Sequence, residues 1–299
     1  GSLEELGPVD GASVLTLCKC TDFRDKDGEE QTIAPMTQAV WFQMPRDWED
    51  LGALVMDPST EGSLEELGPI EIAGGAMYHG QFLGERRHGR GLVVRPDGGR
   101  YEGQFRDDQA TGAGRFLHAN GDLYEGQWVN NRAHGRGRFL HVDGSSYEGE
   151  WEQDAKNGKG CEVWVDGSHF TGEYVGGKKH GFGLFTASDN ASFAGQFTDD
   201  RMEGDGVYTF ADGKVYSGQW RNSQMSGAGH MRWADGRCYE GFFESDRKAG
   251  EGKFTWPDGR SFAGQWCGGK QHGIGTFVDA SGKARNGKWD NGYRIRWLG

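Results

Sequence analysis

The chain has 299 residues, of which 35% are hydrophobic and 53 are glycine, and its formal net charge is −12. This composition does not favour one thick globular core, and no apolar run is long enough to span a membrane. Residues 1–70 hold 4 basic and 15 acidic side chains, whereas residues 71–299 hold 29 and 30. An acidic leader followed by a near-neutral remainder argues against nucleic acid as a partner.

The acidic leader, residues 1–70, shows none of the repetition found in the rest of the chain. Residues 14–20 and 39–44 are typical of short strands. The region around Trp41 and Trp48 is too apolar for a purely solvated tail. We therefore expect part of the leader, around residues 39–56, to pack on the remainder of the chain near its N-terminal end.

A unit of 23 residues recurs nine times without a phase slip in residues 71–284. Each unit opens on an aromatic residue, and these are Tyr78, Tyr101, Tyr124, Tyr147, Phe170, Phe193, Tyr216, Tyr239 and Phe262. Counting the opening residue as place 0, glycine follows at place 2 and a second aromatic at place 4. A Gly-x-Gly pair closes the middle of each unit. Repetition at a short fixed period indicates stacked units that bury surface mainly against their neighbours.

The spacing within the unit predicts a β-hairpin. Places 0, 2 and 4 share one face of a strand because side chains alternate, and the Gly-x-Gly-x-aromatic stretch has the same period. Polar residues lie between the two stretches, and Asp-Gly marks a second turn in most units. Two strands for each unit lengthen the sheet by about 10 Å per unit, so the array is expected to be elongated.

The recurring glycines also predict a register. Because glycine normally weakens a strand, its recurrence implies close approach of a neighbouring strand. We expect places 0–4 to pair antiparallel with places 11–15 of the same unit. The second aromatic would then lie opposite the first glycine of the Gly-x-Gly pair. The aromatic at place 15 would lie opposite the glycine of the next unit.

The sequence YEGQWVNNRAHGRGRFLHVDGSS at residues 124–146 resembles the MORN (membrane occupation and recognition nexus) repeat along its whole length. The resemblance implies an all-β fold, an elongated single-layer twisted antiparallel sheet of stacked 23-residue hairpins. Residues 71–299 would hold nine units and a C-terminal half-unit that starts at Arg285 and acts as a cap. MORN arrays also precede the catalytic domain of plant phosphatidylinositol phosphate kinases. No kinase sequence follows the array here, and no nucleophile, metal or phosphate motif stands apart from the repeat, so we expect no enzymatic activity.

We expect a non-catalytic scaffold that binds a protein partner, a peptide or a helix, along an aromatic-lined groove within a larger assembly. The residues expected to line the groove are Tyr124, Trp128, Tyr147, Trp151, Trp220, Tyr239 and Trp266. Two alternatives stay open. One is a peripheral membrane module, and the other is a regulatory subunit of an enzyme on another chain.

The membrane alternative rests on two basic clusters in predicted loops, which would contact anionic phospholipid or phosphate. Their residues are Arg86, Arg87, Arg90, Lys178 and Lys179. No metal or other cofactor is expected, because the histidines before the Gly-x-Gly pairs and the Cys18-x-Cys20 pair do not form a ligand set. Five cysteines without a disulfide framework favour an intracellular, reducing compartment.

Overall fold

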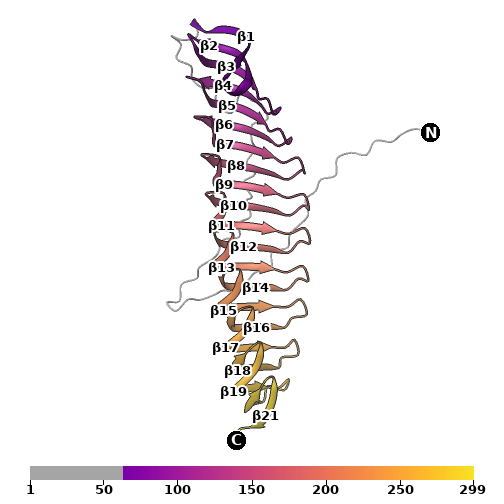
Figure 1. Ribbon diagram of the computed structural model, residues 1–299. Helices are drawn as coiled ribbons and strands as arrows, with labels where there is room; N and C mark the ends of the chain where they lie inside the picture. The colour runs from indigo at the N-terminus through magenta and orange to yellow at the C-terminus, as the bar shows by residue number, and fades with distance from the viewer. Residues whose placement is uncertain (1–62) are drawn as a thin grey trace, which may run out of the picture. The chain divides into compact units, whose positions relative to one another are not determined.

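A computed structural model of the chain describes residues 63–299. These residues form one sheet of 21 strands, in which each strand pairs antiparallel with the next along the chain (Figure 1). The predicted all-β, single-layer sheet of stacked hairpins is confirmed. The expected leader strands at 14–20 and 39–44, and the docking of residues 39–56, lie outside the described residues.

The strands follow the predicted units closely, with two strands to each unit. They are β1 (Glu65–Ile72), β2 (Ala76–Leu83), β3 (Arg86–Val94), β4 (Arg100–Arg106), β5 (Gln109–Leu117), β6 (Leu123–Val129), β7 (Arg132–Leu140), β8 (Ser146–Glu152), β9 (Ala155–Val163), β10 (His169–Val175), β11 (Lys178–Thr186), β12 (Ser192–Thr198), β13 (Arg201–Thr209), β14 (Val215–Arg221), β15 (Gln224–Arg232), β16 (Cys238–Glu244), β17 (Arg247–Thr255), β18 (Ser261–Cys267), β19 (Lys270–Val278), β20 (Ala284–Asp290) and β21 (Tyr293–Trp297). A single 3-10 turn, Ala73–Gly75, separates β1 from β2. No helix among the described residues is long and apolar enough to cross a membrane.

Two-residue turns join the strands of each unit. In the turn between β6 and β7, Asn130 and Asn131 have φ values of 49° and 64°. Positive φ at both central positions defines the type I′ turn, whose twist matches that of the strands it joins. The Asn131 side chain also accepts a hydrogen bond of 2.8 Å from the backbone N–H of Ala110 in the preceding hairpin. The turn residue therefore ties one unit to the next.

Within each hairpin the observed register matches the predicted one for the opening aromatic and the glycine after it, and differs at the second aromatic. Within a unit, the opening aromatic lies opposite the aromatic at place 15, and the glycine at place 2 lies opposite the second glycine of the Gly-x-Gly pair. The same pairs form between units. The prediction that the place-15 aromatic faces a glycine is therefore wrong. The second aromatic does face the first glycine of a pair, but the pair belongs to the preceding unit, as Trp151 and Gly135 show.

A β-bulge inside each hairpin moves the second aromatic away from the first glycine of its own Gly-x-Gly pair. The register of β6 and β7 shifts between Gly126 and Trp128, so Gln127 lies opposite three residues of β7. Gly135, in the bulge, has a φ of 65°, a conformation that suits glycine. The Gln127 side chain closes the bulge, because its Oε1 accepts a hydrogen bond of 2.8 Å from the backbone N–H of Arg136.

Pairs of glycines make room for the opening aromatic rings. The ring of Tyr124 lies over Gly126 and Gly137, and a Cβ atom added to Gly137 would collide with that ring. The ring packs edge-to-face on Trp128 and on Trp151 of the next unit, with centroids 5.1 and 5.2 Å apart. The same contacts recur along the sheet and form one continuous row of rings, the core of the array.

Both ends of the described sheet carry strands that depart from the repeat. Strand β1 pairs antiparallel with β2, and it crosses the domain boundary that the sequence analysis places after residue 70. At the other end, β21 pairs with β20. The ring of Trp297 in β21 packs on Trp289 and Phe277, with centroids 6.0 and 6.4 Å apart. Trp297 therefore covers rings at the end of the array.

Candidate functional site: the inner trough of the sheet

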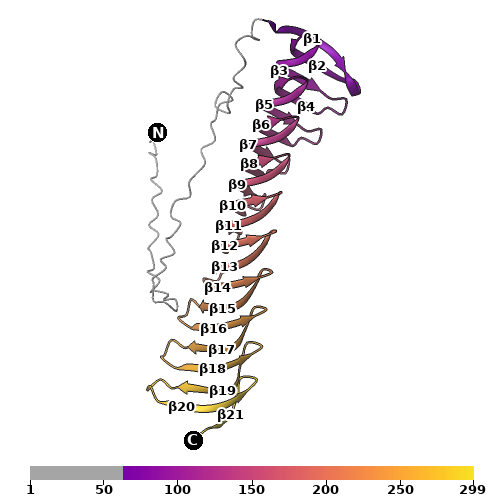
Figure 2. The same ribbon diagram turned by 90° about the vertical axis from the view of Figure 1, so that its left-hand side faces the viewer.

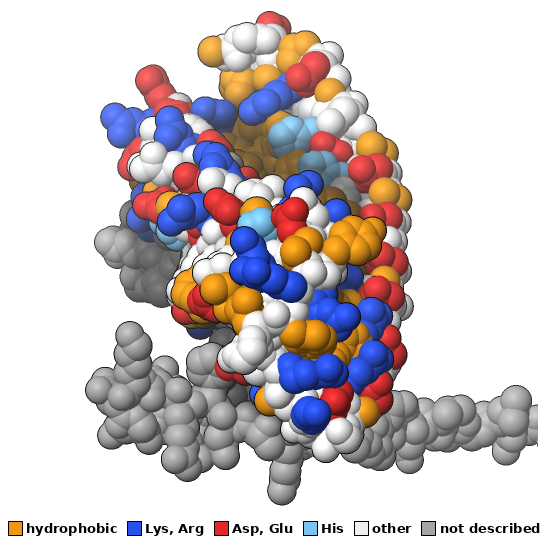
Figure 3. Space-filling view, turned by 90° about the horizontal axis from the view of Figure 1, so that it is seen from below, with side chains coloured by type: hydrophobic (Ala, Val, Ile, Leu, Met, Phe, Trp, Pro, Cys, Tyr) orange, Lys and Arg blue, Asp and Glu red, His pale blue; other side chains and the backbone are white. Residues whose placement is uncertain are grey.

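The two faces of the sheet differ in shape and chemistry. The hairpins stack along one twisted axis (Figures 1 and 2). Seen along that axis, the sheet curls around a hollow in which hydrophobic side chains gather (Figure 3). We call this hollow the inner trough, and its floor is the row of opening and second aromatics. The opposite, outer face carries residues such as Phe182, which is 54% exposed.

Between β3 and β8 the inner trough holds a groove of about 430 Å³. Three residues that the sequence predicts for the groove, Tyr124, Trp128 and Trp151, line it. The other four lie elsewhere in the same row of rings, and they are Tyr147, Trp220, Tyr239 and Trp266. All seven are at most 9% exposed, since the rings bury one another. Contact between any of them and a partner stays a prediction.

The side chain at place 9 of each unit determines how far the inner trough is filled. In chain order these residues are Arg87, Ala110, Ala133, Lys156, Lys179, Met202, Met225, Lys248 and Gln271. The two alanines line the groove, at the place where the other units carry a longer side chain. Alanine at place 9, where most other units carry Arg, Lys or Met, is the sequence signal that could have located the groove.

Lys248 shows what a long basic side chain does at this place. Its Nζ lies 4.5 Å from the ring centroid of Trp266, 4.7 Å from Phe254, 5.5 Å from Tyr239 and 5.7 Å from Trp233. Four rings therefore surround the ammonium group within the range of cation–π attraction. Burial, assisted by the charge of Arg237, lowers the pKa of Lys248 to about 8.

We expect Lys248→Met to stabilise the protein by about 1 kcal/mol at pH 7, a value discounted for the partial exposure of the side chain. Methionine already occupies this place in two other units. Because the folded-state pKa of about 8 lies below the ordinary value of 10.5, the unfolded state binds more protons between these values. Wild-type stability should therefore rise with pH across that window, and the advantage of methionine should disappear above it.

Urea unfolding at a series of pH values checks this expectation, with Met225→Leu as a control for packing at the same place. A wild-type stability that falls between pH 8 and pH 10.5 would show that the ring faces favour the charged lysine more than burial disfavours it.

The two predicted basic clusters lie in strands β3 and β11 and not in loops, and four of their five residues have acidic or aromatic partners. Arg86 and Lys178 form ion pairs with Asp107 and Asp199, with N–O distances of 3.3 and 3.9 Å. Lys179 lies with its Nζ 4.8 Å from the ring centroid of Trp164. Arg90 is exposed, and its backbone N–H bonds the side chain of Gln81.

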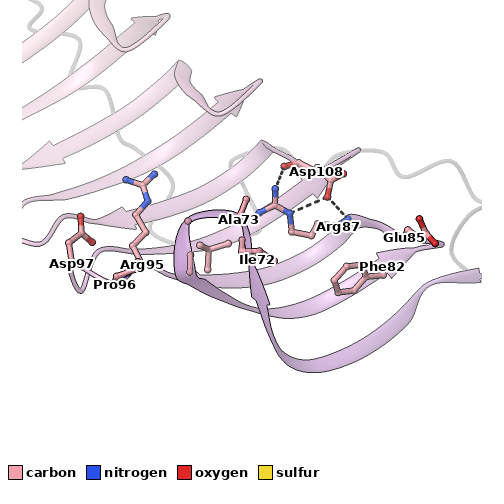
Figure 4. Close-up of a pocket in the computed structure, with 12 residues that line it drawn as sticks. Ile72, Ala73, Phe82, Glu85, Arg87, Arg95, Pro96, Asp97 and Asp108 are labelled. Atoms are coloured by element: carbon pink, nitrogen blue, oxygen red, sulfur yellow. Dashed lines mark hydrogen bonds and ion pairs between the residues drawn. The ribbon is translucent and has the colours of Figure 1, made fainter.

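Arg87 lies at the edge of a second recess, of about 740 Å³, at the N-terminal end of the described sheet (Figure 4). Its Nε lies 3.2 Å from Oδ1 of Asp108, and a second guanidinium nitrogen donates to the Asp108 carbonyl at 2.7 Å. The guanidinium also lies over the rings of Tyr78 and Phe105. Arg87 therefore joins its own hairpin to the next one.

The described residues include no group of three His, Cys, Asp or Glu side chains placed to hold a metal ion. Cys161, Cys238 and Cys267 are free thiols. The buried Nδ1 of His88 has no hydrogen-bond partner. Cys18 and Cys20 lie outside the described residues.

The family model of the MORN repeat matches nine consecutive segments of the chain. They are residues 78–100, 101–123, 124–146, 147–169, 170–192, 193–215, 216–236, 239–259 and 262–284. The chain therefore belongs to the MORN repeat family, as the sequence resemblance predicts. No curated protein matches the chain significantly.

Several solved structures show a similar run of strands. The TCP10 domain of Danio rerio CPAP, in complex with a peptide of Danio rerio STIL, is 14% identical with a TM-score of 0.42, and the match covers 78% of this chain and 99% of that one. The Drosophila melanogaster SAS-4 TCP domain, in complex with a proline-rich motif of Ana2, is 14% identical with a TM-score of 0.27, over 74% and 100% of the two chains. This likeness is too distant to assign a partner to the present chain.

Proposed function

We propose that the chain is a non-catalytic scaffold whose inner trough binds an extended or helical segment of a partner protein. The observation that carries this proposal is the groove of about 430 Å³ between β3 and β8. There, Ala110 and Ala133 line the groove at the place where most other units carry Arg, Lys or Met. An apolar, concave surface of this kind fits a protein segment better than a soluble metabolite.

Site-directed photocrosslinking tests the proposal on the full chain. Phe139, at the edge of the groove, is replaced by benzoylphenylalanine, and Phe182 on the outer face receives the same replacement as a matched control. Irradiation in an extract of the source cells should join residue 139 to a discrete protein, and residue 182 should give much less of that product. Equal products from both positions, or none from residue 139, would contradict binding in the trough.

The membrane alternative has less support, because Arg86 and Lys178 pair with carboxylates of the adjacent turns. Exposed pairs of this kind are weak, so liposome flotation is the direct test. We expect flotation of the full chain to be the same with and without anionic lipid. Flotation that requires anionic lipid and is lost in the Arg86→Ala, Arg90→Ala double variant would favour a membrane module over a protein-binding scaffold.

A further inference from the structure

The groove around Ala133 repeats the ring arrangement that surrounds Lys248, but without a basic side chain. The rings around Lys248 have counterparts at the same places of the unit and its neighbours. Around Ala133 these counterparts are Trp151, Phe139, Tyr124 and His118, and all four line the groove. We call them, with Ala133 itself, the Ala133 cage.

The two sets of rings have nearly the same geometry. The Phe and Trp centroids are 6.3 Å apart in the Ala133 cage and 6.2 Å apart around Lys248, at interplanar angles of 39° and 41°. The Tyr and Trp centroids are 5.2 Å apart in both. The fourth ring lies 5.8 Å from the phenylalanine in the Ala133 cage and 5.6 Å from it around Lys248. The rings that accept the Lys248 ammonium are therefore already in place around Ala133.

The Ala133 cage has, in addition, a carboxylate that the Lys248 site lacks. Asp154 lines the groove, and its Oδ1 accepts a hydrogen bond of 2.7 Å from the backbone N–H of Ala133. The equivalent residue beside Lys248 is Gly269. The equivalent residue beside Arg87 is Asp108, which does pair with that guanidinium. Asp154 therefore stands at the place from which Asp108 pairs with Arg87.

The surrounding charges favour a cation at the Ala133 cage rather than at its neighbour, Ala110. Beside Ala110, the guanidinium of Arg95 already lies 4.6 Å from the ring centroid of Phe116. Burial lowers the pKa of His118, so this imidazole is uncharged at neutral pH. In the following unit, Lys156 is neutralised by Glu162 at 2.6 Å.

We infer that the Ala133 cage binds a lysine or arginine side chain of the partner segment that occupies the inner trough. The partner's basic group would lie between the faces of Trp151 and Phe139 and pair with the carboxylate of Asp154. Its alkyl stem would cover the rings, as the place-9 side chains do in other units. This inference rests on the proposed function, and it adds the chemistry of the segment that the trough selects.

Selection of a random peptide library, displayed on phage, against the full chain tests the inference. Peptides that bind should share one basic residue, and binding should be lost in Ala133→Lys, which supplies the cage with its own lysine. This variant should fold normally because lysine occupies the same place in three other units, and its melting temperature checks this. Ala194→Lys, on the exposed outer face, is the matched control and should retain binding.

A second pair of changes separates the carboxylate from the rings. Asp154→Asn should weaken the binding of a selected peptide by about tenfold. Asparagine keeps the backbone bond, because Asn131 makes the same bond to Ala110. Replacing the peptide's basic residue with norleucine should weaken its binding to the wild type by a similar factor. The same replacement should weaken its binding to the Asp154→Asn variant much less.

The outcomes distinguish the two proposals. If the selected peptides lose binding in the Ala133→Lys variant but share no basic residue, the cage inference is overturned and the trough remains a binding site. Selected peptides that bind Ala133→Lys as well as they bind the wild type, or a library that yields no binder, would contradict both. A norleucine peptide that binds as tightly as the basic one would also overturn the inference.

Discussion

Gly137→Val should be among the most destabilising single substitutions in the array, at about 3 kcal/mol. Gly137 is buried under the ring of Tyr124, and even one added carbon would collide with that ring. The ring is only 3% exposed and packs between two other aromatics, so it has no free space to enter. The backbone would have to move instead, which would weaken the pairing of β7 with both neighbouring strands.

The adjacent residue supplies the control. Arg136 is exposed, and its side chain points to the opposite face because side chains alternate along a strand. Arg136→Val should change stability by less than about 1 kcal/mol, since valine suits a strand. Thermal unfolding followed by circular dichroism compares the two variants. Equal melting temperatures would show that the ring does not lie over Gly137.

Tyr216→Ala should cost about 3–5 kcal/mol, because it removes a fully buried ring from the middle of the row. Tyr216 is 0% exposed, and its ring packs edge-to-face on Trp220 and Phe243 at 5.2 and 5.0 Å. Burial raises the pKa of its hydroxyl, which stays protonated and donates to the Gln219 carbonyl at 2.9 Å. Alanine would leave a cavity between two units and remove this hydrogen bond.

Tyr216→Phe separates the ring from the hydroxyl. Phenylalanine opens three other units of the same array, so the ring alone satisfies the packing. This variant should lose only the hydrogen bond, about 1 kcal/mol. Denaturant unfolding measures both changes. A phenylalanine variant that loses as much stability as the alanine variant would show that the hydroxyl, and not the row of rings, holds adjacent hairpins together.

The repeat makes most of this fold readable from the sequence. Aromatic and glycine residues two places apart define strands, and an unbroken phase of 23 residues defines a stack of hairpins. The partner of the second aromatic within its own hairpin was predicted incorrectly because the bulge at Gly135 places three residues opposite one. That bulge depends on a hydrogen bond from the backbone to the Gln127 side chain, which no alternation of residue types reveals.

The groove could be predicted only in part from the sequence. The sequence identified the rings of the inner trough, but it did not show that rings such as Tyr147 and Tyr239 are almost completely covered by their neighbours. The depth of the trough instead depends on place 9, where Ala133 replaces a long side chain. The importance of Asp154 follows from its contact across the boundary between two units, which a comparison of aligned units does not show.

The most direct test of the central claim is a crystal structure of the full chain with the partner segment that crosslinks to residue 139. This segment should lie in the inner trough between β3 and β8, against Trp128 and Trp151. A segment bound along the outer face, or on the strand ends that carry Arg86 and Lys178, with the groove unfilled, would contradict this expectation.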